Sequence, residues 1–222
     1  MLRRSFILGA GGALLTAGLG AAAWRNSTGS LATYKAYSDQ IRGDLRPSEA
    51  GDLIRYATLA ANSHNTQPWR FRIGADAIDV QPDFSRRTSA VDPDDHHLFI
   101  SLGCACENLA IAAATTGRPG EIVIAPDTGA ARYLFVNGRH KSDPLLAAIV
   151  KRQSTRAQYD GRPIPNSDLV SLSQAAAVPG VHLTLLTDRP MISKVRDLVI
   201  AGNDAEMNDP AFVSELKQWL RF

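Results

Sequence analysis

The chain has 222 residues, which is enough for one large domain or two small ones with a sizeable core. Its apolar fraction of 45% and charged fraction of 21% are those of an ordinary globular protein and exclude a disordered one. The formal net charge of +2 and the lack of a basic run interleaved with aromatic residues argue against nucleic acid as a partner.

The first 29 residues predict an export signal. Arg3 and Arg4 precede a mildly apolar stretch, residues 6–23, that is rich in Gly and Ala and ends in three alanines. This pattern is typical of the twin-arginine pathway, which carries folded proteins, and it predicts a periplasmic or cell-envelope location. A single membrane anchor is the alternative, because the run is nearly long enough to span a bilayer. We expect no stable membrane insertion beyond the signal.

Residues 31–151 predict helices around a few short strands. The longest helix runs from Asp94 to Gly117 and is apolar nearly all round, as expected of a helix at the centre of a fold. The other expected elements are a helix over 31–42, a helix opened by residues 47–49, a hairpin of strands 69–73 and 78–81, strands 122–124 and 133–136, and a helix that Asp143 and Pro144 begin.

The rest of the chain weakly repeats an earlier order of elements. Pro165 opens a helix that ends in three alanines, and a strand over 181–186 and a helix from Pro190 follow. Because residues 47–73 show a similar helix and strand, we expect an internal duplication. A last helix begins at Asp209 and breaks off at Phe222 without a stopping residue.

Two clusters of reactive side chains favour structural roles. Cys104 and Cys106 stand at i and i+2 of a helix and point to different faces, so we expect buried free thiols and not a disulfide. His96 and His97 diverge once a helix starts, and the acids before them suit a helix N-terminus, so we expect no metal site there. No Ser-His-Asp or Cys-His signature occurs, and catalytic residues stay unassigned.

The segment from Asn62 to Phe71 is the densest group of polar side chains, between a helix and a strand. Its amides and hydroxyls could hydrogen-bond a flat ligand with a polar edge, because Asn and Gln offer a donor and an acceptor at once. The alternative is an Asx-type turn that caps the preceding helix. We call residues 62–67 the signature loop.

A second polar segment, residues 152–156, reads Arg-Gln-Ser-Thr-Arg. Arginines at i and i+4 share one helix face or flank one turn, with hydroxyls between them. Guanidinium groups in that arrangement suit a phosphate. The alternative is a solvated basic turn.

Together the two segments resemble the flavin-binding nitroreductase family, in its single-chain, duplicated branch (the Acg-like proteins), over roughly residues 47–222. The resemblance implies an α+β fold in which long helices flank a mixed sheet, with an export segment at 1–29, a first half at 30–150 and an incomplete second half at 151–222. It implies FMN as cofactor and assigns its ring edge and phosphate to six residues: Ser63, Asn65, Gln67, Arg152, Ser154 and Arg156. Asn62 departs from the pattern, because a Pro is common there.

The resemblance has two further implications. It places Gly103, Glu107 and Asn108 where the family's central helix packs closely, so we expect structural roles for them. It also implies a truncated chain, because the family continues well beyond Phe222.

The same resemblance implies an FMN-dependent oxidoreductase. It would reduce a nitroaromatic, a quinone or a similar small acceptor by a ping-pong route, with NADH or NADPH as the reductant, and would act as a pseudo-dimer in one chain or as a homodimer. One alternative is a flavin-binding or flavin-sequestering protein without turnover, in which a lid segment closes over the ring. Another is an exported helical interaction module whose polar loop is only a turn.

Overall fold

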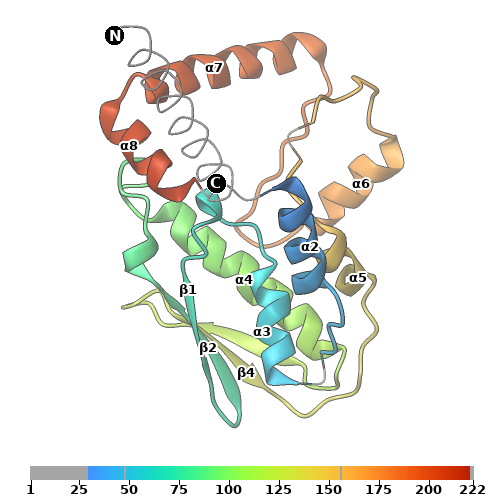
Figure 1. Cartoon of the computed structure of the whole chain (residues 1–222). Helices are drawn as coiled ribbons and strands as arrows, with labels where there is room; N and C mark the ends of the chain where they lie inside the picture. The colour runs from blue at the N-terminus through green and yellow to red at the C-terminus, as the bar shows by residue number, and fades with distance from the viewer. Residues whose placement is uncertain (1–29, 48, 156, 221–222) are drawn as a thin grey trace, which may run out of the picture. The chain divides into compact units, whose positions relative to one another are not determined.

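The computed structural model describes residues 30–220 apart from residues 48 and 156 (Figure 1). The predicted export signal and Arg156 therefore lie outside the described part of the chain. The contacts divide the chain into two compact units, one up to Arg152 that also includes the chain from Trp219 on, and one from Gln153 to Gln218.

The first unit contains a sheet of four strands in the order β1-β2-β4-β3. The strands are β1 (Trp69–Ile73), β2 (Ala77–Pro82), β3 (Gly120–Ile124) and β4 (Ala131–Phe135). All three pairs are antiparallel. The predicted hairpin is confirmed, with Trp69 opposite Pro82 and Ile73 opposite Ile78. β3 is an outermost strand, and its residues Ile122, Val123 and Ile124 are 40%, 48% and 64% exposed.

Helix α4 (His96–Ala114) is the core of this unit and lies against the sheet (Figure 1). It packs on α3 (Ala50–Thr58), on α5 (Pro144–Lys151) and on strands β2, β3 and β4. Its buried residues are Leu98, Ser101, Leu102, Ala105, Cys106, Leu109, Ala112 and Ala113. The prediction of a central apolar helix is confirmed. Among the described helices, α4 alone is long and apolar enough to cross a membrane by length and composition.

Local signals in the sequence set the starts of two helices. α2 (Leu31–Arg42) begins after Ser30, whose Oγ accepts a hydrogen bond from the Thr33 N–H at 3.0 Å. α5 begins after Asp143, which accepts from the Leu145 N–H at 2.8 Å, and Pro144 occupies the first turn. Both helices are found where they were predicted. Two short 3-10 turns complete this unit: η1 (Ser63–Asn65) lies between α3 and β1, and η2 (Phe84–Arg86) lies between β2 and α4.

The second unit contains α6 (Asn166–Ala175), α7 (Arg189–Met207) and most of α8 (Pro210–Trp219). These helices confirm the predicted starts near Pro165, Pro190 and Pro210. The predicted strand over 181–186 is wrong: the segment has no regular structure, and Val181 is 52% exposed. A strand is stable only where its backbone N–H and C=O groups find a neighbouring strand, and the described part of this unit offers none. The internal duplication that relates residues 30–150 to residues 151–222 remains a prediction.

The α+β fold class is confirmed, and it is consistent with a nitroreductase-like fold. The resemblance implied a mixed sheet with parallel and antiparallel pairs, whereas all the strand pairs that the structure describes are antiparallel.

Candidate functional site

The signature loop joins α3 to β1, and its backbone is left-handed at three positions. The φ angles are +45° at His64, +55° at Asn65 and +53° at Gln67. A residue other than glycine in this region costs about 1–3 kcal/mol and persists only when its surroundings fix it. Such residues cluster at binding sites, so this loop is the strongest candidate site in the first unit.

Asn62 fixes the loop from within. Its Oδ1 accepts from the Gln67 N–H at 2.8 Å, and its Nδ2 donates to the Ala60 carbonyl at 3.1 Å. The side chain of Asn62 therefore serves the fold, in the manner of the Asx-type turn considered above. Asn62, where the pattern of the resembling family commonly has Pro, is therefore the residue whose side chain joins the two ends of the loop.

Helix α4 supports the loop from one side. The Ser63 N–H donates to Ser101 Oγ at 3.4 Å, and that hydroxyl donates to the His97 carbonyl at 2.6 Å. Ser101 is buried, so its hydroxyl acts as a fixed relay between the helix backbone and the loop. No pattern in the sequence indicated that this serine has a partner in the loop.

Several polar side chains of the loop remain for a ligand. Within the part of the chain that the structure describes, the hydroxyl of Ser63, the imidazole of His64 and the amide of Gln67 make no hydrogen bond, whereas Asn65 does have a partner. The hydroxyl and the carboxamide are partly exposed. A carboxamide and a hydroxyl match the alternating donors and acceptors of a flavin pyrimidine edge, so this donor set fits the cofactor that the resemblance implies.

A buried carboxylate lies directly behind the loop. Asp83 accepts from Arg70 Nη2 at 3.1 Å and is 2.9 Å from Arg70 Nε, while Ser85 donates to it through its N–H at 3.1 Å and its hydroxyl at 2.6 Å. The Arg70 hydrogen bond is the main reason that the pKa of Asp83 falls to about 2, with the Ser85 bonds added, although burial acts the other way.

We expect Asp83→Asn to lower the free energy of unfolding by about 1–2 kcal/mol at neutral pH, a value reduced for the exposure of Arg70. Because the folded pKa lies below the unfolded one, this stabilisation is present above about pH 4 and is lost as the pH falls toward about 2. Urea denaturation across this range should show the two proteins converging in acid. Asp39→Asn, which breaks an exposed pair with Lys35, should cost less than about 0.5 kcal/mol throughout.

Arg152 lies near the start of the loop. Its Nη2 donates to the Leu59 carbonyl at 2.8 Å, at the end of α3 and just ahead of Asn62. This bond uses one of the five N–H donors of the guanidinium, which leaves others for an anion. Ser154 is exposed and belongs to the second unit, and Arg156 lies outside the described residues. The structure thus brings Arg152 to the loop, and the phosphate role of the three residues stays a prediction.

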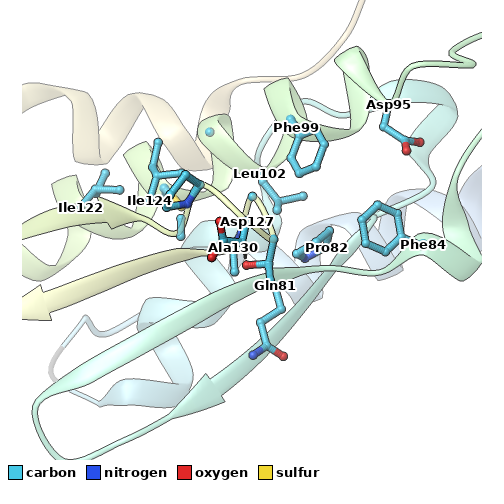
Figure 2. A pocket seen from close by; sticks show the side chains of 16 residues that line it. Gln81, Pro82, Phe84, Asp95, Phe99, Leu102, Ile122, Ile124, Asp127 and Ala130 are labelled. Atoms are coloured by element: carbon cyan, nitrogen blue, oxygen red, sulfur yellow. Dashed lines mark hydrogen bonds between the residues drawn. The ribbon is translucent and has the colours of Figure 1, made fainter.

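A cavity of about 980 Å³ opens beside α4 (Figure 2). It lies on a different face of the helix from Ser101, which bonds the signature loop. Phe99, Gly103 and Cys106 line it from that face. Phe84 meets Phe99 edge-on, with ring centroids 6.4 Å apart. The remaining wall comes from the end of β2, from β3 and β4 and from the turn between β3 and β4. The predicted site residues are not among those that line the cavity.

Sequence reasoning missed this cavity and misjudged Gly103. A Cβ at Gly103 would meet nothing within 4 Å among the described residues, so the expected close packing is wrong at this position. Asn108 does have the expected structural role, because its Nδ2 donates to the Tyr56 carbonyl of α3 at 3.1 Å. The signal that could have located the cavity is the apolar triplet Ile122-Val123-Ile124 on a short strand that faces α4.

The two cysteines are free, as predicted. Cys106 is buried, and burial raises the pKa of its thiol to about 11, with a smaller contribution from Glu107. Cys104 is half-buried. The acids ahead of α4 serve its N-terminus as expected: Asp92 accepts from the backbone N–H groups of His97 and Leu98, each at 3.0 Å.

Comparison with known proteins supports a relationship to the nitroreductase family. No protein-family model matches the chain. Two relatives from Mycobacterium tuberculosis, one from strain CDC 1551 / Oshkosh and one from strain ATCC 25618 / H37Rv, each bear the name "Putative NAD(P)H nitroreductase". Each is 27% identical to this chain over 175 residues, which is 75% of this chain and 49% of the relative. The chain therefore spans about half the length of the curated relatives it matches.

Proposed function

We propose that this chain binds FMN at the signature loop and forms part of an oxidoreductase of the nitroreductase type. The observation that carries the proposal is a contrast inside the loop. The side chain of Asn62 makes two hydrogen bonds to the backbone, whereas the side chains of Ser63 and Gln67 have no hydrogen-bond partner among the described residues. The similarity to two proteins named as NAD(P)H nitroreductases supports the same class of reaction.

The chain's own residues would divide the work of holding the cofactor. Ser63, Asn65 and Gln67 would face the pyrimidine edge of the ring, and Arg152, Ser154 and Arg156 would face the phosphate. Bound flavin supplies hydride or electron transfer between NADH or NADPH and a small acceptor such as a nitroaromatic or a quinone. Tight fixation of the loop backbone would hold the amide groups in place without reorganisation on binding.

The wider setting is part of the same proposal. The paired arginines support export by the twin-arginine pathway after the cofactor has been loaded, to the periplasm or cell envelope. The proposed active form is a pseudo-dimer within one chain or a homodimer.

A flavin-loading experiment tests this function. The full chain is incubated with FMN, freed of excess by gel filtration, and examined for an absorbance band at about 450 nm. We expect roughly one flavin per chain, and bleaching of the band when NADH or NADPH is added without oxygen. Protein that retains no flavin contradicts the proposal. Protein that retains flavin but does not bleach supports the sequestering alternative instead.

A further inference from the structure

The turn that follows β2 holds the signature loop on both sides of Gln67. Arg86 Nη1 donates to the Thr66 carbonyl at 2.7 Å, and the Asp83 N–H donates to the Pro68 carbonyl at 3.0 Å. The backbone of Gln67 is itself bonded twice, through its N–H to Asn62 Oδ1 at 2.8 Å and through its carbonyl to the Trp69 N–H at 2.9 Å. Four hydrogen bonds therefore determine the peptide units around one residue.

These bonds explain how Gln67 persists at a φ of +53°. A glutamine gains nothing from a left-handed backbone, and the conformation costs about 1–3 kcal/mol unless neighbouring contacts impose it. The side chain does not repay that cost, because it makes no hydrogen bond to any described residue. What the conformation does achieve is to set the direction in which a half-buried carboxamide leaves the backbone.

Among these four hydrogen bonds, the one from Arg86 to the Thr66 carbonyl has a charged donor, and that donor lies 20 residues away in the sequence. Thr66 is only 1% exposed, so its carbonyl would have little access to water if Arg86 were removed. The guanidinium is oriented in turn by Asp83, whose Oδ2 lies 3.8 Å from Arg86 Nε. Asp83 is held by Arg70 and Ser85, so a connected set of polar groups extends from the outer face of β1 to the loop.

We propose that Arg86 is a positioning residue for the Gln67 amide, acting through the Thr66 carbonyl, and that Asp83 holds Arg86 for this purpose. The inference rests on the proposed function and deepens it: the loop recognises the polar edge of a flavin with a geometry that is fixed before the ligand arrives. Arg86 does not touch the ligand in this scheme.

Three variants of the full chain separate positioning from general stability. Arg86→Met removes the donor and the charge. Arg86→Lys keeps a charged donor that can reach the same carbonyl and should rescue much of the effect. Arg87→Met is the matched control, because Arg87 is the next residue along and its guanidinium pairs with Asp95 at 2.8 Å and bonds the Pro93 carbonyl instead of the loop.

Two measurements are made on each variant, with the melting temperature recorded beside them. The first is amide hydrogen exchange of residues 62–69 in the flavin-free protein, and the second is the FMN dissociation constant together with the visible circular dichroism of the bound flavin. For Arg86→Met we expect faster exchange, a dissociation constant raised about 10-fold and an altered dichroism spectrum. For Arg86→Lys we expect a change within about 3-fold, and for Arg87→Met within about 2-fold.

The outcomes separate the inference from the function on which it rests. Loop exchange and FMN affinity that are both unchanged in Arg86→Met would overturn the inference and leave the proposed function intact. Equal losses in Arg86→Met and Arg87→Met would also overturn it, because they would show a general effect of charge or stability. A wild-type chain that binds no FMN would overturn the proposed function and the inference together.

Discussion

A Leu109→Ala substitution should destabilise the first unit by about 2–5 kcal/mol. Leu109 is fully buried on α4, the helix that packs on the sheet and on α3. Removal of its isobutyl group loses the transfer free energy of the apolar carbons and leaves a cavity that the surrounding side chains fill only in part. Urea denaturation followed by far-ultraviolet circular dichroism would report the loss.

Ile100→Ala supplies the matched control for this experiment. Ile100 lies on the same helix but is 50% exposed, so its truncation should change the free energy of unfolding by less than about 1 kcal/mol. If both substitutions proved equally costly, the burial of α4 in the structure would be wrong. If neither had an effect, α4 would not be the core helix.

A Gln67→Ala substitution should raise the FMN dissociation constant by about 10–100-fold with little change in stability. The amide makes no hydrogen bond to the described part of the protein, so its loss leaves no buried group unsatisfied. Its loss would remove one donor and one acceptor from the proposed ring contact. Fluorescence quenching of free FMN on titration with protein measures the effect.

Gln81→Ala is the control for the flavin titration, because Gln81 is a glutamine of the neighbouring strand β2 and belongs to the lining of the cavity beside α4. We expect its FMN affinity to stay within about 2-fold of the wild type. Loss of affinity in Gln81→Ala together with normal affinity in Gln67→Ala would move the flavin to that cavity and contradict the proposed site.

Elements with local signals could be predicted from the sequence. α2 and α5 start at Ser30 and Asp143, because a side-chain oxygen at each position caps the first turn. α4 was evident from nineteen residues with almost no charge, and the hairpin from a short turn between two apolar runs. The segment over 181–186 has the same apolar character as a strand, but a strand depends on a partner that no local pattern specifies.

The candidate site could be located from the sequence, but its construction could not. The polar density of residues 62–67 marked the loop, which the sequence left open between a ligand site and an Asx-type turn. The partners that fix the loop come from distant positions, Arg86 on Thr66 and Ser101 on Ser63, and such pairs leave no trace in spacing. The cavity beside α4 was missed because Phe99 is 38% exposed, whereas an apolar residue on a core helix is expected inside.

The outermost position of β3 has a practical consequence. Its outer backbone groups face no described strand, and three successive aliphatic side chains stand partly in solvent. An unprotected edge of this kind is a template on which another polypeptide can add by main-chain pairing, and natural sheets usually guard it with lysine or proline. Concentrated samples should therefore self-associate through residues 120–124, and replacing Val123 with lysine should keep the protein monodisperse.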